Sequence, residues 1–219
     1  MPRRSILSAA ERESLLALPD TKEDLIRYYT FSDTDLSIIR QRRGPANRLG
    51  FAVQLCYMRY PGVMLALDEE PFAPVLRQVA TQLKVPLEAW ADYGQRAETR
   101  REHLLELQSV FGFQPFTTRH YRPSVYSLDE LAWQTDKGIV LATTLVDSLR
   151  RKNVLLPTPG VIERICAEAV TRANGRIYAT LSEPLSDMHR RRLDDLLQRR
   201  DNGKTTSLAW LRQSPAKPN

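Results

Sequence analysis

Residues 42–62 read RRGPANRLGFAVQLCYMRYPG, and this stretch decides how the whole chain is interpreted. Gly44 can adopt a positive φ and Pro45 suits the first turn of a helix, so we predict a helix over about residues 46–60. Its apolar residues recur at helical spacing and form one face: Leu49, Ala52, Val53, Cys56 and Tyr60. Pro61-Gly62 then ends the helix.

Upstream of Gly44 the sequence carries signals for helix starts. A Ser or Thr stands three positions before an acid, the pattern of a capping box, at Ser8–Glu11, Thr21–Asp24, Ser32–Asp35 and, farther downstream, Ser127–Glu130. In each pair the hydroxyl can accept from a free backbone amide, and the acid complements the positive end of the helix dipole. The first three pairs predict short helices at about 9–17, 21–29 and 33–41.

Downstream of Pro61 helical spacing continues and strand signals are nearly absent. Apolar residues predict helices at about 72–84, 96–111, 128–134, 138–151, 160–173, 175–182 and 186–200, with Asn174-Gly175 ending one of them. Gly, Pro and Thr residues interrupt the pattern between 112 and 125, where we expect a domain boundary or hinge. The sequence thus predicts an all-α fold of two small helical modules, 1–115 and 116–200. Residues 201–219 look like the start of a linker.

The charge is unevenly distributed along the chain. The 219 residues include 32 Lys+Arg and 26 Asp+Glu, a net charge of +6, and 26 of the basic residues are Arg. Residues 1–110 hold 15 basic and 15 acidic side chains, so the excess lies in the second half. Arg offers a planar fork of donors that suits phosphates and guanine edges. This charge, with a pI near 9.5, indicates a polyanionic partner, although an Arg-rich proteome would give the same composition.

Several classes of protein do not fit this sequence. No apolar run approaches the ~18 residues of a membrane-spanning helix, and no apolar core follows the basic N-terminus, so we expect no signal peptide. Cys56 and Cys166 lie in apolar helical patterns and are interpreted as reduced core thiols. No nucleotide-binding or hydrolase motif occurs, and the three histidines lack metal-ligand spacing. We expect no cofactor, no metal and no catalysis by this segment alone.

The junction at Gly44-Pro45 has the layout of a helix-turn-helix unit, in which two helices meet at a short turn containing Gly. The second helix would begin with Asn47 and Arg48, and in such units these N-terminal residues reach base edges. Asn and Gln pair with adenine and Arg with guanine, so Gln54 is a candidate as well. An ordinary helical corner with solvated arginines explains the same pattern.

Two further basic clusters carry weaker signals. Helices 138–151 and 160–173 could form a second unit, with Arg150–Asn153 closing the first helix; cations there also complement the helix dipole without any ligand. Arg164, Arg172 and Arg176 would lie on the polar side of the next helix, where Glu168 can pair with Arg172. The run Thr99–His103 could clamp phosphates or cap its own helix.

The residues also resemble a known family, the transposases of the Tn-three class. The resemblance covers essentially the whole chain and rests on an ordered series of short motifs: Leu25–Phe31, Asp35-Leu36, Ile39-Arg40, Gly44, Asn47–Cys56, Arg59–Gly62, Tyr93, Arg96, Thr99–His103, Thr135–Gly138, Leu155–Pro157, Glu163-Arg164, Ala167–Ala169, Arg172-Ala173, Leu181–Leu185 and Trp210–Arg212. The resemblance implies the N-terminal region of a much longer bacterial enzyme, acting at the nucleoid in the cytoplasm.

The same resemblance implies a function. The family's N-terminal region is mostly helical and binds the terminal inverted repeats of the transposon, whereas a carboxylate triad with two Mg²⁺ ions in a downstream RNase H-like domain cuts DNA. No acid of this chain corresponds to that triad. We therefore expect sequence-specific binding of double-stranded DNA, with possible self-association; the alternative is an interaction or oligomerisation arm with only non-specific DNA affinity. The expected DNA contacts are Arg40, Arg42, Arg43, Asn47, Arg48, Gln54, Arg100, Arg101, Lys137, Arg151, Lys152, Arg164, Arg172 and Arg176.

Overall fold

Helices account for all named elements of the computed structural model, which describes residues 5–66, 69–93, 97–199 and 205–212. Within these ranges the β-structure is limited to two isolated bridges, Gln114 with Val154 and Arg199 with Thr206. The prediction of an all-α fold is confirmed. The chain divides into two compact units, Met1–Thr171 and Arg172–Asn219.

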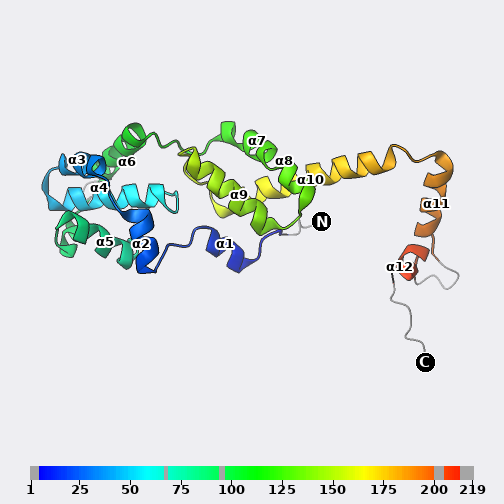
Figure 1. Ribbon diagram of the computed structural model, residues 1–219, viewed down its shortest axis with the longest axis horizontal. Helices are drawn as coiled ribbons and strands as arrows, with labels where there is room; N and C mark the ends of the chain where they lie inside the picture. The colour runs from blue at the N-terminus through cyan, green and yellow to red at the C-terminus, as the bar shows by residue number, and fades with distance from the viewer. Residues whose placement is uncertain (1–4, 67–68, 94–96, 200–204, 213–219) are drawn as a thin grey trace, which may run out of the picture. The chain divides into compact units, whose positions relative to one another are not determined.

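The first group of helices in unit 1 surrounds α4, as Figure 1 shows. It consists of α2 (Lys22–Tyr29), α3 (Asp33–Arg40), α4 (Gly44–Arg59), α5 (Ala73–Leu83), the 3₁₀ helix η1 (Leu87–Asp92) and α6 (Ala97–Phe111). Every residue from 49 to 58 is buried. Helix α4 is therefore the central helix of a core, with only its first turn and its end near the surface.

Close packing explains why α4 carries Gly50. A Cβ built on this residue would lie 2.1 Å from the Tyr93 ring, so only glycine lets the ring lie against the helix backbone. The ring packs with Trp90 of η1 at a centroid distance of 5.3 Å. Burial raises the pKa of the Tyr93 hydroxyl to about 12.

The second group in unit 1 contains α7 (Thr118–Ser127), α8 (Asp129–Gln134), α9 (Gly138–Arg151) and the part of α10 (Pro159–Ser182) that belongs to this unit. Its buried apolar residues recur at helical spacing on α9 and α10: Leu141, Ala142, Leu145, Val146, Leu149, Ile162, Ile165, Cys166 and Ala169. Both predicted apolar stripes are therefore buried.

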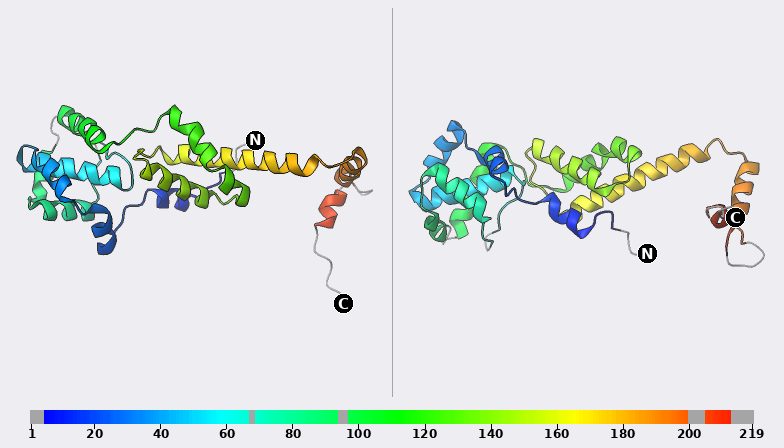
Figure 2. Two further views of the ribbon diagram at one scale, coloured as in Figure 1. Left: turned by 45° about the horizontal axis from the view of Figure 1, so that its top comes forward. Right: turned by 60° about the horizontal axis from the view of Figure 1, so that its bottom comes forward.

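Helix α1 (Ala9–Leu15) lies beside α9, although α2 follows it in sequence, as Figures 1 and 2 show. Glu163 of α10 holds the segment before α1 by accepting from the Ser5 hydroxyl at 2.6 Å and the Ile6 amide at 3.0 Å. It also forms a salt bridge of 2.9 Å with Arg12. Burial alone would raise the pKa of Glu163, but these partners lower it below its ordinary value.

The two groups of unit 1 are joined by backbone contacts. The Gln114 amide donates to Asn153 O and the Leu155 amide to Gln114 O, both at 2.8 Å, and the Leu156 amide donates to Gly62 O at 2.7 Å. The predicted division near residue 115 therefore lies inside one compact unit, with α1 packed against the downstream helices. Whether the two groups act on DNA as separate modules stays a prediction.

Some of the predicted helix caps and helix ends are confirmed and others are wrong. The capping boxes at Ser8–Glu11 and Ser32–Asp35 are formed, and Thr21 caps α2. The prediction of a capping box at Ser127–Glu130 is wrong, because the Ser127 hydroxyl donates to Ser124 O and Leu128 is the N-cap of α8. The interruption at 112–125 contains most of α7, and Asn174-Gly175 does not end a helix, since α10 continues to Ser182.

Unit 2 contains the end of α10, α11 (Asp187–Leu197) and α12 (Ser207–Leu211). Helix α12 packs on α11, and Ser186 caps α11 by accepting from the His189 amide at 3.3 Å. Helix α11 nevertheless has no buried residue. The predicted helix at 186–200 is confirmed in its existence and ends earlier, at Leu197.

Candidate nucleic-acid interface

The turn between α3 and α4 leaves the start of α4 open to a ligand. Residues 41–43 connect the helices, and Gly44 has a φ of +81°. Arg43 is the N-cap, without a side-chain hydrogen bond, and no acid lies in the first turn. The first amides of a helix lack internal partners and carry the positive end of its dipole. An anion placed here would meet free donors and no opposing carboxylate of that turn.

The arginines around this turn divide into two kinds. Arg42 pairs with Glu106 of α6, and its guanidinium lies 5.0 Å from the centroid of the Phe51 ring. Arg40, Arg43 and Arg48 are exposed. Arg42 therefore ties the turn to α6, and we leave it out of the candidate interface although it was predicted to contact DNA. The other three side chains face solvent.

The polar residues that follow the turn differ in the same way. Asn47 is half-buried and donates to Arg43 O at 3.1 Å, and Arg48 Nε donates to Arg42 O at 2.9 Å. Gln54 is fully buried and donates to Leu65 O at 3.3 Å. The expectation that Gln54 reaches a base is wrong for this fold, because α4 is enclosed by other helices beyond its first turn.

An ion pair with a buried carboxylate joins α3 to α4. Both guanidinium nitrogens of Arg59 donate to Asp35, at 2.9 and 2.6 Å, and the Ser32 amide donates to the same carboxylate at 2.9 Å. Burial alone would raise the pKa of Asp35, but the hydrogen bonds from Arg59 and Ser32 lower it. Because Arg59 is the last residue of α4, the pair ties the end of α4 to the first turn of α3.

The third basic cluster, on α6, is largely internal. Arg100 donates to Tyr93 O at 3.1 Å and lies over the rings of Trp90 and Tyr93, at 5.8 and 5.2 Å. His103 is buried, with Nδ1 3.3 Å from the Tyr93 hydroxyl, and burial lowers its pKa. Arg101 is exposed. Of the two predicted contacts in this cluster, only Arg101 is exposed, and its contact with DNA stays a prediction.

The α9–α10 corner repeats the division seen at the first corner. Arg150 Nε donates to Pro61 O at 2.8 Å, and the guanidinium lies 4.4 Å from the centroid of the Tyr60 ring. Arg151 and Lys152 are exposed, as is Lys137 at the N-cap of α9. Arg150 links the two helical groups, and its neighbours face solvent.

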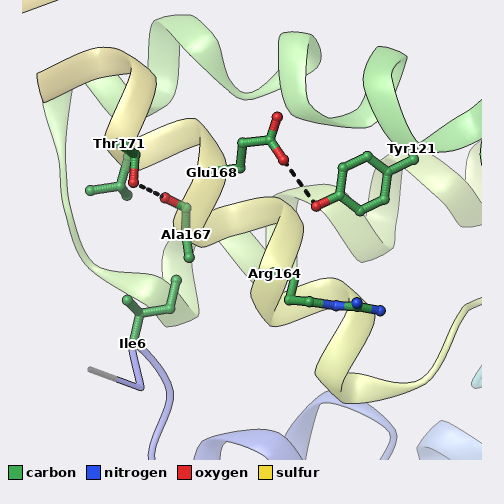
Figure 3. A pocket seen from close by; sticks show the side chains of 7 residues that line it. Ile6, Tyr121, Arg164, Ala167, Glu168 and Thr171 are labelled. Atoms are coloured by element: carbon green, nitrogen blue, oxygen red, sulfur yellow. Dashed lines mark hydrogen bonds between the residues drawn. The ribbon is translucent and has the colours of Figure 1, made fainter. Parts of the chain in front are cut away.

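A pocket of about 490 Å³ lies between α7 and α10 (Figure 3). The Tyr121 hydroxyl donates to Glu168 at 3.0 Å, and the exposed Arg164 lines the same pocket. Helix α7 also carries the exposed Arg119 and Arg122 and has no acidic residue. Neither arginine is among the predicted contacts, because the Gly, Pro and Thr residues of 112–125 predict an interruption; the acid-free run 117–127 is the signal that could have found them.

The remaining predicted contacts, Arg172 and Arg176, are exposed residues of unit 2. Among the described residues no group of three or more His, Cys, Asp or Glu could hold a metal ion. No described helix has the length and apolar character needed to cross a membrane. Both cysteines are free and buried, and burial raises the pKa of the Cys166 thiol to about 12.

Comparison with known proteins assigns this chain to a family. Residues 6–169 match the family described as a domain of unknown function, DUF4158. Over all 219 residues the chain is 74% identical to the transposase for transposon Tn21 and 68% identical to that for Tn3926, both from Escherichia coli. It is 55% identical to the transposase for transposon Tn501 of Pseudomonas aeruginosa.

Each match covers the whole of this chain, which spans 22% of the length of each of these relatives. The ordered motifs of the sequence and these matches, which cover all 219 residues of the chain, indicate the same group of proteins. The chain therefore belongs to the DUF4158 family, and its resemblance to transposases of the Tn-three class is confirmed.

Proposed function

We propose that this chain is a DNA-binding segment of a transposase and that it recognises the terminal inverted repeats of its transposon. The observation that carries the proposal is the open first turn of α4, which combines free amides with the exposed Arg40, Arg43 and Arg48 and no acid. The similarity to transposases supports DNA as the polyanion, because such enzymes must locate the ends of their element.

The open turn combines two modes of recognition. The amides and the dipole end of α4 hold a phosphate, while Arg43 and Arg48 extend toward the groove. Because Asn47 donates to Arg43 O, adenine contact by Asn47 requires that bond to open. Base discrimination therefore rests mainly on the arginines, which pair with guanine.

The α7–α10 surface supplies a second set of contacts in unit 1. Arg119 and Arg122 are exposed on α7, and the exposed Arg164 of α10 lines the pocket of Figure 3. Arg151, Lys152 and Lys137 add charge on α9. Two basic surfaces suit an extended site, because each reads only a few base pairs.

In this proposal a different region of the full-length transposase carries out catalysis. The chain spans 22% of those transposases, and the family resemblance implies a Mg²⁺-dependent domain beyond the matched region. The segment then supplies recognition, and strand cleavage requires the rest of the enzyme.

Fluorescence anisotropy tests the proposal. We expect the 219-residue chain to bind a duplex from the end of transposon Tn21 about 10³-fold more tightly than a scrambled duplex, with a steep dependence on salt. Arg43→Ala with Arg48→Ala should weaken binding to the Tn21 end far more than binding to the scrambled duplex, because base contacts carry the discrimination. Arg77→Ala, an exposed arginine on α5, is the matched control. Equal affinity for both duplexes would refute sequence-specific recognition.

A further inference from the structure

Glu106 of α6 lies at one end of a series of contacts that reaches Arg48 near the start of α4. Its carboxylate accepts from Arg42 Nη1, and the Arg42 guanidinium lies over the Phe51 ring, 5.0 Å from the centroid. The backbone oxygen of Arg42 accepts in turn from Arg48 Nε at 2.9 Å. A carboxylate on α6 therefore holds the residue whose carbonyl orients an exposed arginine on α4.

The Arg42 carbonyl is held from two sides. The Arg42 amide donates to Ile39 O at 3.0 Å, which attaches the backbone of the turn to α3. The ion pair with Glu106 attaches the same residue to α6. The side chains of Arg42 and Glu106 are 18% and 34% exposed, so solvent and salt screen this pair less than a pair on the open surface. The oxygen that receives Arg48 is thus attached to two different helices.

Arg48 keeps the donors that a guanine base needs. Its side chain is exposed, and no carboxylate of the described residues forms a salt bridge with it. Because Nε is bound to the Arg42 oxygen, the two Nη groups form the outward end of the guanidinium. Guanine offers two acceptors, O6 and N7, in the major groove, and a bidentate arginine is their commonest specific partner. A side chain that is already held also loses less conformational freedom on binding than a free one.

We propose that Arg48 contacts a guanine base of the DNA site and that Glu106 is its positioning residue, acting through Arg42. This inference rests on the proposed function and adds to it one base and one residue that need not touch DNA. The carboxylate of Glu106 would repel phosphate, so its contribution to binding is indirect: it holds Arg42, and Arg42 holds Arg48.

Fluorescence anisotropy with modified duplexes tests the guanine contact. In the duplex from the end of transposon Tn21, each guanine is replaced in turn by 7-deazaguanine, which lacks the N7 acceptor. We expect one position at which the replacement weakens binding of the 219-residue native chain about tenfold, within the range of one bidentate pair. Arg48→Ala should bind the modified and unmodified duplexes equally at that position, because the arginine that distinguishes them is gone.

Glu106→Ala tests the positioning role. It should reduce the tenfold ratio at that guanine to about threefold, because Arg48 is present but no longer held. The matched control is Glu102→Ala, which removes the same charge from an exposed side chain of α6 and should leave the ratio unchanged. The two duplexes carry equal charge, so a general change in electrostatic attraction cancels in the ratio. Glu106→Gln, which keeps the size of the side chain and removes its charge, should lower the ratio by less.

Nuclear magnetic resonance of the free chain tests the same role without DNA. The Nε–H resonance of Arg48, identified by its loss in Arg48→Ala, should exchange with solvent faster in Glu106→Ala than in the native chain. Glu102→Ala should leave this exchange unchanged. Circular dichroism checks that every variant is folded, so that faster exchange reports the release of one side chain.

The outcomes separate this inference from the proposed function. Equal affinity of the native chain for the Tn21 end and a scrambled duplex would refute the proposed function and the guanine contact together. A native chain that prefers the Tn21 end, with no guanine whose effect depends on Arg48, would overturn the guanine contact alone. If Glu106→Ala matches Glu102→Ala in both the affinity ratio and the exchange of Arg48 Nε–H, the positioning role is wrong.

Discussion

The α3–α4 corner and the α9–α10 corner look alike in sequence and differ in the structure. Each has a helix that ends in basic residues, a proline near the start of the next helix, and a glycine inside that helix. In the first corner the second helix, α4, is buried at every position from 49 to 58. In the second corner α10 keeps an exposed side that includes Arg164 and Glu168.

Within both corners one arginine is structural and its neighbour is exposed. Arg42 pairs with Glu106 and Arg150 stacks on Tyr60, while Arg43 and Arg151 face solvent. An arginine cluster is therefore not one functional unit. The flat guanidinium next to an aromatic ring anchors the corner, and the adjacent side chain is exposed.

The glycines of the two second helices should give the largest contrast. Gly50→Ala would place a Cβ 2.1 Å from the Tyr93 ring, so we expect a loss of about 3 kcal/mol in the free energy of unfolding, measured by urea denaturation. A loss below about 0.5 kcal/mol, the usual scatter of surface substitutions, would show that the ring can move away and that α4 is less tightly enclosed.

The carboxylates that pair with Arg59 and Arg150 should differ nearly as much. Asp35 is 6% exposed beside Arg59, whereas Asp147 is 58% exposed and 3.5 Å from Arg150. Removing one partner of a buried pair is costly, so Asp35→Asn should destabilise by about 3 kcal/mol. Asp147→Asn, the control, should cost less than about 0.5 kcal/mol.

The Asp35 pair also predicts a dependence on pH. Its pKa is lower in the folded chain than in the unfolded chain, so its contribution is complete above the ordinary Asp pKa and is lost as pH falls through the folded value. The difference in stability between the native chain and Asp35→Asn should therefore shrink below about pH 4. A difference that is constant from neutral to acidic pH would contradict the assigned pair.

Arg150 and Arg151 test whether neighbouring arginines of the α9–α10 corner have different roles. Arg150→Ala should cost about 2 kcal/mol, because it removes the stacking on Tyr60 and the hydrogen bond to Pro61. Arg151→Ala should stay within about 0.5 kcal/mol. Thermal unfolding of both variants checks this, and equal losses would mean that the two arginines share one role.

Gly175→Ala should give the smallest effect and the opposite sign. Gly175 lies inside α10, and nothing within 4 Å would meet an added Cβ. Because alanine has the higher helix propensity, we expect a gain of about 0.5–1 kcal/mol in helix stability. A loss seen by denaturation would show that the interior of α10 needs glycine here, as α4 does at Gly50.

Much of the helical pattern could be read from local chemistry. Ser8, Thr21 and Ser32 cap helices as predicted, and Gly44-Pro45 marks the start of α4, because these signals act within a few residues. The same reasoning failed at Asn174-Gly175, where the helix continues, and at 112–125, where α7 forms. Pro123 lies inside α7 and Gly175 inside α10, so neither residue ends its helix in this structure.

The candidate site was less accessible to sequence reasoning. The basic corners were found, but Gln54 looked like a polar recognition residue until the enclosure of α4 showed it buried. Arg42 and Arg43 are neighbours with the same charge, and nothing local separates the one that meets Glu106 from the one that meets solvent. Arg119 and Arg122 were missed with α7.

Local sequence signals specify that this chain is helical and where most of its helices begin, because caps, turns and apolar spacing act within a few residues, and the ordered motifs specify the family that it resembles. Contacts between distant residues specify that α1 packs on α9, that Glu163 holds the segment before α1, and that Arg42 and Arg150 are anchors. Those outcomes depend on partners distant in sequence: burial and charge pairing are settled between helices, and no local pattern specifies them.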